Sequence, residues 1–232
     1  MDEKVIRINK FLSNAGFCSR KETNRLIEEN RIKVNKEYCN IGQWIKETDE
    51  ILVDDKVVPV KKKVYIVLNK PVGVTCTAAR EVKNNIIDFI NYPDYIFPVG
   101  RLDKDSEGLI LMTNDGELAS TISDAANEHE KEYLVTVDKP FEDEFMINMS
   151  AGVEIFGVKT RPCKVIRVDK DTFRIILSQG LNRQIRKMTK AFGYNVISLK
   201  RIRILNIKID GLETGSWRNL TENEMLQLRK QT

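Results

Sequence analysis

Apolar residues recur at helical spacing near the start of the chain. Four of them form one face of a helix across residues 7–15: Ile8, Phe11, Leu12 and Ala15. Gly16 follows and favours a helix end. Ser19 and Glu22 have the spacing of a capping box, which predicts the start of a second helix.

Strand spacing takes over after this second helix. The stretch RIKVN (31–35) alternates between polar and apolar residues, which predicts a strand. Apolar positions around Trp44 and at 51–53 predict further strands. Residues 1–60 therefore form a compact helix–helix–strand module that is large enough to fold alone. The charged, proline-containing stretch 59–63 is expected to be a linker, and its composition suggests that the module is mobile.

Residues 64–232 are expected to form one larger domain. Its strand-like segments are VYIVLNK, YLVTVD, CKVIRV, FRIILSQ and VISLKRIRILNIKI. Helices are predicted at 117–123, 140–149, 183–192 and 222–230. Crossover helices do not separate the strands regularly, so the expected fold class is α+β, with a mixed, mostly antiparallel sheet flanked by helices.

Composition narrows the class of protein. The four cysteines lie far apart and the only histidine is His129, so a zinc site has almost no ligands to draw on. The N-terminus begins with charged residues, and no apolar run is long enough for a signal peptide or a membrane span. We expect a cytoplasmic protein with reduced thiols.

Charge is distributed unevenly along the chain. Residues 156–208 carry 14 Lys and Arg against two acids, whereas residues 91–155 carry four against 15. This asymmetry suggests a polyanionic partner. Alternatively, the two segments lie side by side and neutralise each other.

The predicted N-terminal helices also carry basic residues. Five of them could form one phosphate-binding face: Lys10, Arg20, Lys21, Arg25 and Lys33. The alternative is an ordinary solvated helix surface.

The densest candidate site is GRLDKDSEGL, residues 100–109, in which Asp103, Asp105 and Glu107 lie beside two basic residues. The spacing opens like a calcium loop, but Asn114 replaces the bidentate glutamate at its twelfth position. A metal-dependent nuclease would need further clustered carboxylates. A simple surface turn also explains the segment.

A second candidate site spans residues 178–193. Asn182 can cap a helix whose buried stripe is Ile185, Met188 and Phe192, with Arg183, Lys187 and Lys190 on its basic face. Arg186, at the edge of the stripe, could point into a cleft and pair with a carboxylate, because such pairing favours the charged form. A helix that binds nucleic acid without catalysis is the alternative.

A third candidate is the strand that follows His129. Alternation places Lys131 and Tyr133 on one face of this strand. Taken by itself, Tyr133 is expected to be a buried aromatic residue of the strand. His129 is expected to be structural or on the surface.

Five motifs, taken in order, resemble one known family: NKPVGV, GRLDKDSEGLILMTNDG, KEYLV, GLNRQIRKM and LKRIRI. They are similar to the RsuA/RluB/RluE/RluF family of pseudouridine synthases, and HEKEYLVTVDKP looks closest to the RluF branch. The N-terminal run INKFLSNAGFCSRKETNRLIEENRIKVN resembles the small S4-like (alpha-L) RNA-binding domain.

The resemblance implies a role for each matching residue. Asp103 would be the catalytic nucleophile, Tyr133 the active-site tyrosine and Arg186 the basic partner of the aspartate. Leu199 would be an apolar wall of the pocket, and Arg101 would fill the space left by a flipped uridine. Arg183 and Lys187 would bind substrate.

The implied activity is isomerisation of a uridine in 23S ribosomal RNA. A tRNA uridine is a second target, and a uridine of small-subunit ribosomal RNA is the alternative to the 23S site. The reaction is redox-neutral, so no cofactor and no metal is expected. We expect a monomer that binds ribosomal RNA and no membrane. The alternative from another class is a non-catalytic RNA-binding or ribosome-assembly factor.

Overall fold

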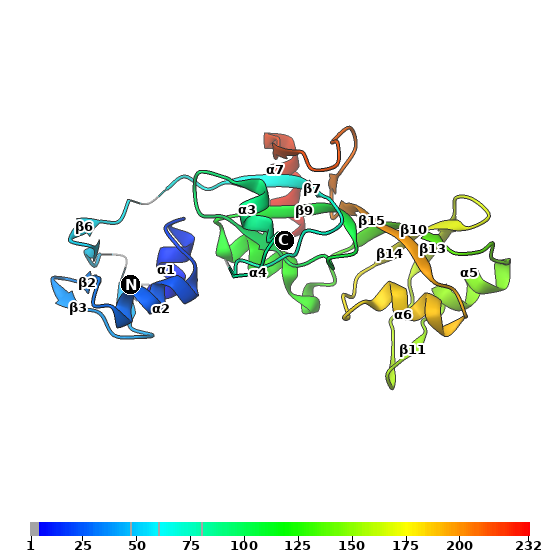
Figure 1. The fold of residues 1–232 in the computed structure, drawn as a ribbon, viewed down its shortest axis with the longest axis horizontal. Coiled ribbons are helices and arrows are strands. Elements are labelled where there is room, and N and C mark those ends of the chain that lie inside the picture. Colours follow the sequence, from blue (N-terminus) through cyan, green and yellow to red (C-terminus); the bar gives the residue numbers. More distant parts are fainter. Residues whose placement is uncertain (1–4, 47, 60, 80) are drawn as a thin grey trace.

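The computed structural model describes residues 5–46, 48–59, 61–79 and 81–232. Figure 1 shows an N-terminal module at one end of an elongated molecule and a long twisted sheet running through the rest. No helix in the described part of the chain is both long and apolar enough to cross a bilayer.

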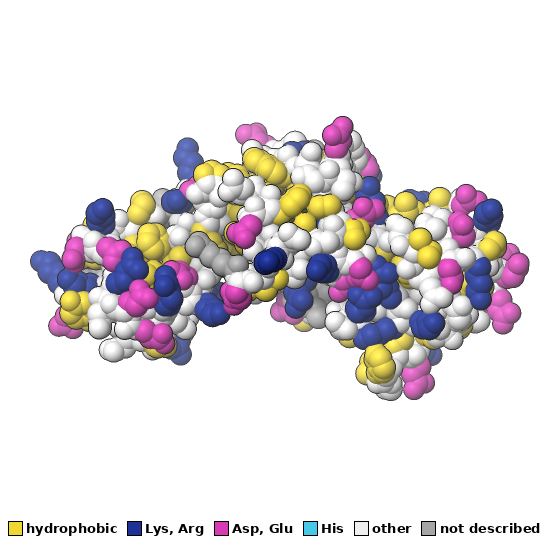
Figure 2. Space-filling model, viewed as in Figure 1, with side chains coloured by type: hydrophobic (Ala, Val, Ile, Leu, Met, Phe, Trp, Pro, Cys, Tyr) yellow, Lys and Arg dark blue, Asp and Glu magenta, His cyan; other side chains and the backbone are white. Residues whose placement is uncertain are grey.

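The N-terminal module has the predicted elements. Its helices are α1 (Ile8–Asn14) and α2 (Arg20–Glu28), and Ser19 Oγ accepts a hydrogen bond from the Glu22 amide at 3.0 Å, as the predicted cap requires. The strands pair as β1 (Val5–Arg7) with β4 (Trp44–Lys46), and in the order β3 (Glu37–Tyr38), β2 (Ile32–Val34), β5 (Ile51–Val53), β6 (Lys56–Val57). Figure 2 shows basic and acidic side chains intermixed over its visible face.

Contacts join this module to the rest of the molecule. The Lys63 ammonium donates to the carbonyl of Asn14 at 3.0 Å, and Lys21 lies 3.5 Å from a carboxylate oxygen of Glu81. The Lys61 amide donates to the Ala15 carbonyl at 3.3 Å. The predicted linker 59–63 is therefore bonded on its C-terminal side, which favours a docked module over the mobile one suggested by composition; Val60 lies outside the described residues.

Within the described part of the chain, the larger sheet has nine strands. Seven of them are ordered β13 (Lys164–Arg167), β14 (Thr172–Leu177), β10 (Lys131–Val137), β15 (Val196–Ile204), β9 (Glu107–Thr113), β7 (Tyr65–Lys70) and β17 (Trp217–Asn219). β8 (Phe97–Val99) pairs with β9, and β16 (Ile207–Lys208) with β15. Only β9 and β15 run parallel among these described pairs, so the predicted mixed, mostly antiparallel sheet is confirmed.

Helices flank this sheet at the four predicted places. They are α4 (Gly116–Ser123), α5 (Asp143–Ser150), α6 (Gln184–Ala191) and α7 (Glu222–Gln231). The structure adds α3 (Ile86–Ile90), capped by the Asn85 side chain, and a hairpin of β11 (Glu154–Ile155) and β12 (Val158–Lys159). Five-residue and two-residue elements carry too little periodicity to be predicted from sequence.

Candidate active site

Asp103 lies in the loop between β8 and β9, directly before the short parallel pairing of β9 with β15. The Ser106 amide donates to the Asp103 carbonyl at 3.1 Å, and the Lys104 carbonyl accepts from the Gly73 amide at 2.8 Å. The loop is thus held by its own backbone, which leaves the Asp103 side chain free to face outward; that side chain is 34% exposed.

A buried arginine anchors this loop from below. Arg201, 3% exposed, donates from Nε to the Leu109 carbonyl at 2.7 Å and from Nη1 to the Arg101 carbonyl at 3.4 Å. One side chain therefore ties the start of the loop to the strand that follows it. Sequence reasoning missed this residue, which appeared only as one basic position in the motif LKRIRI.

A buried lysine lies beneath the same loop. Lys70 is fully buried and donates to the carbonyls of Pro71 and Val74, each at 2.9 Å. Burial lowers the pKa of this ammonium, and the negative charges of loop acids such as Asp103 act in the opposite direction. The motif NKP pointed to Lys70, although no role beyond shaping the strand end could be argued from sequence.

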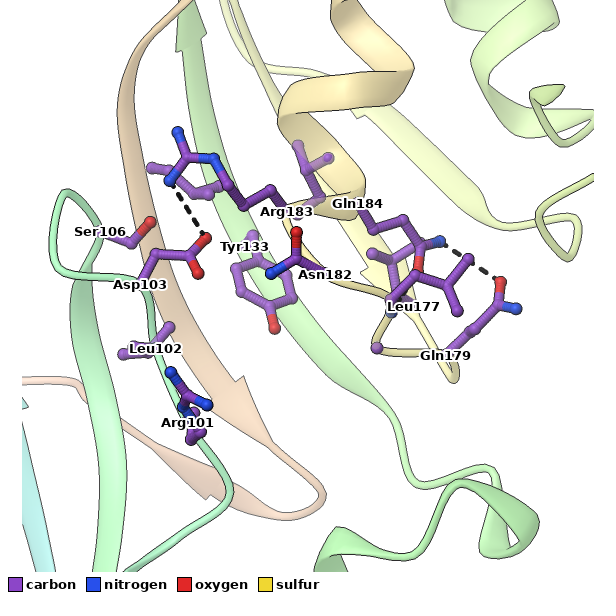
Figure 3. Close-up of a pocket in the computed structure, with 14 residues that line it drawn as sticks. Arg101, Leu102, Asp103, Ser106, Tyr133, Leu177, Gln179, Asn182, Arg183 and Gln184 are labelled. Carbon is purple, nitrogen blue, oxygen red and sulfur yellow. Dashed lines mark hydrogen bonds and ion pairs between the residues drawn. The ribbon is translucent and has the colours of Figure 1, made fainter. Parts of the chain in front are cut away.

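The outward face of the loop borders a cavity of about 330 Å³. Its walls include Asp103, Tyr133, Leu199, Arg101 and Arg183, so the structure brings together residues that are far apart in sequence. Figure 3 shows the Asp103 carboxylate pointing toward the side of the Tyr133 ring. The volume lies at the lower end of the range for small-ligand pockets.

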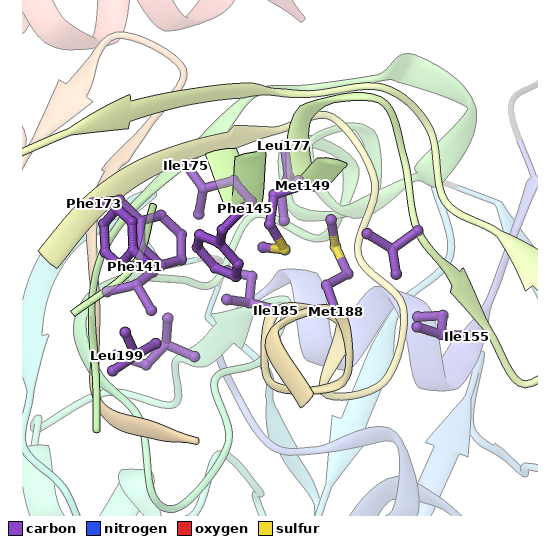
Figure 4. Packing of buried hydrophobic residues seen from close by; sticks show 13 residues of the cluster. Phe141, Phe145, Met149, Ile155, Phe173, Ile175, Leu177, Ile185, Met188 and Leu199 are labelled. Atoms are coloured by element: carbon purple, nitrogen blue, oxygen red, sulfur yellow. The ribbon is translucent and has the colours of Figure 1, made fainter. Parts of the chain in front are cut away.

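Sheet order explains why Tyr133 and Leu199 meet Asp103. Tyr133 is on β10 and Leu199 on β15, and β10, β15 and β9 are neighbours in the sheet. Val135 pairs with Leu199 in the antiparallel register, and Tyr133 lies two residues from Val135 on the same face. Both pocket side chains pack on the apolar cluster beneath, where α5 and α6 cover the sheet (Figure 4).

Arg183 is the arginine that reaches Asp103. Its Nη1 lies 3.8 Å from Asp103 Oδ2, and its two terminal nitrogens donate to both carboxylate oxygens of Asp105 at 2.8 Å. These hydrogen bonds lower the pKa of the Asp105 carboxyl. Arg183 is also the N-cap of α6, with φ 51°. The predicted cap was wrong, because Asn182 Oδ1 instead accepts from Lys187 Nζ at 3.2 Å.

Arg186 contacts the same loop by a different route. Its Nη2 donates to the Asp105 carbonyl at 2.8 Å and its Nη1 to the Val196 carbonyl at 3.2 Å. Its ion pair is with Asp105, at 3.4 Å from Nε to Oδ2, so among the described residues it joins α6 to the loop without pairing with Asp103. The expected pairing of Arg186 with the nucleophile is therefore replaced by one with its neighbour.

The acidic and basic segments do lie side by side, as the alternative interpretation proposed. Six arginines of residues 156–208 each pair with an acid of residues 91–155: Arg161, Arg167, Arg174, Arg183, Arg186 and Arg203. The lysines of the basic segment make no ion pair among the described residues. The surplus positive charge is therefore carried mainly by lysines.

The five basic residues of the N-terminal module are not equivalent. Lys33 pairs with Asp55 at 2.7 Å, Arg25 with Glu22 at 2.6 Å, and Lys21 with Glu81 at 3.5 Å. No ion pair involves Lys10 or Arg20 within the described residues. The predicted phosphate-binding face is thus partly neutralised by the protein itself.

His129 is structural, one of the two expectations for it. It is buried, and its ring nitrogens lie 3.3 Å and 3.2 Å from the carbonyl oxygens of Ile122 and Gln231. Over the residues that the structure describes, no three His, Cys, Asp or Glu side chains are grouped so that they could hold a metal ion.

Comparison with known proteins identifies the family of this chain. A family model described as RNA pseudouridylate synthase matches residues 64–191, and the S4 domain model matches residues 6–51. The dual-specificity RNA pseudouridine synthase RluF of Escherichia coli K12 is 46% identical over 233 residues, which cover 99% of this chain and 80% of that protein. The chain belongs to the RNA pseudouridylate synthase family.

Other similarities extend along the whole synthase. The ribosomal large subunit pseudouridine synthase B of Bacillus subtilis is 34% identical over 232 residues, covering 96% of this chain and 95% of that one. A crystal structure of a pseudouridylate synthase superposes with a TM-score of 0.70 at 29% identity, covering 96% and 99% of the two chains. The family, the α+β fold with an S4-like domain and the enzyme class, an isomerase acting on RNA, are confirmed.

Proposed function

We propose that this synthase isomerises one specific uridine in 23S ribosomal RNA, and that a tRNA uridine is a second target. The observation that carries the proposal is the juxtaposition of a partly exposed carboxylate, Asp103, with an aromatic ring, Tyr133, in a cavity large enough for a nucleoside. The names of its relatives, one a dual-specificity and one a large-subunit enzyme, favour these substrates.

Asp103 acts as the nucleophile in this proposal. Its carboxylate forms a bond to the nucleotide, or stabilises the cationic sugar, as the bond from uracil nitrogen to the sugar carbon breaks. The uracil turns, and its carbon-5 bonds to the same sugar carbon. The carbon-5 proton leaves and the freed ring nitrogen takes up a proton, so the product is an isomer of uridine. Asp103 is released as a carboxylate, so electrons balance without a cofactor.

The other pocket residues hold the base during this exchange. The Tyr133 ring stacks on the uracil, and Leu199 gives the pocket an apolar wall. Flipping the uridine out of its helix costs roughly a few kcal/mol, and Arg101 fills the vacated space. Arg183 places a positive charge beside Asp103, whereas Arg186 fixes the loop that carries it.

Phosphate contacts supply most of the affinity for RNA. The free lysines of the basic segment, Lys187 among them, and the basic helices of the N-terminal module provide these contacts. We further propose that residues 1–60 and 64–232 are two domains of a cytoplasmic monomer, the first binding RNA and the second carrying the chemistry. The family-model matches, 6–51 and 64–191, lie within these limits.

Pseudouridine mapping tests the proposal. Ribosomal RNA and tRNA are sequenced from cells that make either the intact protein or Asp103→Asn, with Asp105→Asn as the matched control. One uridine of 23S RNA modified by the intact protein and by Asp105→Asn, but not by Asp103→Asn, is the expected result. Identical maps with and without the intact protein would instead favour a binding-only assembly factor.

A further inference from the structure

An exposed phenylalanine forms the tip of the β11–β12 hairpin. Phe156 is 86% exposed, and with Gly157 it makes the two-residue turn between the strands. Phe156 has φ 52°, a left-handed conformation that an aromatic residue rarely adopts. Neither burial nor turn preference therefore explains an aromatic ring at this position.

The hairpin that carries this ring is firmly fixed. Ile155 belongs to the same buried cluster as Ile185 and Met188 of α6. At the base of the hairpin, the Thr160 amide donates to the Val153 carbonyl at 2.9 Å, and the Val153 amide donates to Thr160 Oγ1 at 2.9 Å. Phe156 is thus presented to solvent on a rigid support.

A cation–π contact at the tip and a hydrogen bond at the base link the hairpin to the rim of the cavity that Asp103 borders. At its tip, the Lys187 ammonium lies 4.6 Å from the centroid of the Phe156 ring and donates to Asn182 Oδ1 at 3.2 Å. At its base, the Arg161 amide donates to Gln179 Oε1 at 3.1 Å. Asn182 and Gln179 both line the cavity, so the hairpin is held at a set position relative to the bound nucleotide.

The charge around the hairpin tip favours nucleic acid as the occupant. Lys187, Lys190 and Lys159 lie on α6 and β12, and none makes an ion pair among the described residues. Figure 2 shows basic side chains gathered over α6, next to the apolar hairpin tip. An exposed ring among unpaired cations is the arrangement by which proteins hold single-stranded RNA, since the ring stacks on a base and the cations bind phosphates.

We propose that Phe156 stacks on an unpaired base of the RNA substrate, next in the strand to the uridine held in the cavity. This inference rests on the proposed function, because it takes the occupant of the cavity to be a uridine of RNA. It adds a contact to a flanking nucleotide. The hairpin would then favour RNA targets in which a second base, beside the uridine, can also turn out of its stack.

Binding of two short RNAs to the full-length protein tests the stacking. One probe is an oligomer of eight uridines, and the other keeps a single central uridine between abasic riboses. Intact protein should bind the first roughly 5- to 150-fold more tightly, the range expected for stacking of one base. Phe156→Ala should bind both probes alike, whereas Phe156→Trp and the control Phe89→Ala, an exposed aromatic on α3, should keep the preference.

Several outcomes would overturn the proposal. These are an intact protein with no preference between the probes, a Phe156→Ala protein that keeps the preference, and a Phe156→Leu protein that keeps all of it. Circular dichroism checks folding, which an 86% exposed side chain should not affect. Pseudouridine formation by the intact protein in 23S RNA is measured separately, so that a failure of the proposed reaction is distinguished from a failure of stacking.

Discussion

The Nη1 atom of Arg183 lies 3.8 Å from Oδ2 of Asp103, while the same guanidinium holds both carboxylate oxygens of Asp105 at 2.8 Å. The left-handed conformation of Arg183, φ 51°, occurs at the start of α6, where its side chain meets the loop between β8 and β9. Both Arg183 and Arg186 therefore join α6 to the loop that carries Asp103, but only Arg183 reaches the Asp103 carboxylate. Arg183 and Arg186, three residues apart in the sequence, therefore have different roles: Arg183 places its charge beside Asp103, and Arg186 binds the backbone of the loop.

We expect Arg183→Ala to lower the rate of the chemical step by roughly 10- to 100-fold, since it removes the positive charge beside Asp103, the proposed nucleophile. Arg183→Lys should recover part of the rate. Single-turnover pseudouridine formation at saturating enzyme measures this. Lys187→Ala, one turn along the same helix, is the matched control and should weaken RNA binding instead. Equal single-turnover rates for Arg183→Ala and the intact enzyme would contradict the assignment.

Arg186→Ala should act mainly on stability. Its guanidinium donates to the carbonyls of Asp105 and Val196, and its side chain is only 14% exposed. Losing hydrogen bonds of this kind costs about 1–3 kcal/mol in the free energy of unfolding. Urea unfolding measures the loss, and Arg174→Ala, which removes an arginine whose side chain is 44% exposed, is the comparison. A loss of activity without any loss of stability would assign Arg186 to the chemistry itself.

Much of this site could be predicted from sequence because its motifs are local. The motif GRLDKDSEGL identified Asp103 as a candidate. Strand alternation predicted the face of the strand on which Tyr133 lies. The pairing of the two arginines could not be predicted in this way. Asn182 is a residue type that often caps helices, but the N-cap of α6 is the next residue, Arg183. A shift of one residue in the helix start changes which arginine side chain reaches Asp103. The motifs NKPVGV and LKRIRI contain Lys70 and Arg201, but the roles of both residues could not be predicted, because their side chains donate to backbone carbonyls that only the folded chain brings near.

Asp105 makes stability depend on acid pH. Its pKa is lowered in the folded protein, first by hydrogen bonds from Arg183, so the carboxylate stabilises the fold above its unfolded pKa near ~3.9. This stabilisation is lost as the pH falls through the lowered folded-state pKa. The pair is half-exposed, so its contribution should be at most about 1 kcal/mol. In urea unfolding, Asp105→Asn should be less stable than the intact protein at pH 6, and the difference should shrink by pH 3. A constant difference across this range would rule out the linkage.

Gly108 lies in the parallel pairing of β9 with β15. Gly108 pairs with Arg201 and has φ 108°, and a Cβ there would lie 2.3 Å from the Arg201 carbonyl oxygen and 2.6 Å from its amide nitrogen. Backbone atoms cannot give way as a flexible side chain can, so Gly108→Ala must push β15 away from the catalytic loop. We expect a loss of roughly 3 kcal/mol or more in the free energy of unfolding, together with loss of activity.

Gly73→Ala is the matched control for this change. Gly73 also has a positive φ, 92°, but no atom lies within 4 Å of its would-be Cβ, so only backbone strain of about 1–2 kcal/mol is added. Thermal unfolding of both variants separates the close contact from the strain. Equal losses would mean that the strands can separate at Gly108 without cost. A much larger loss for Gly108→Ala would show that strand contact positions the loop, because Arg201 ties that loop to β9 from directly beneath the contact.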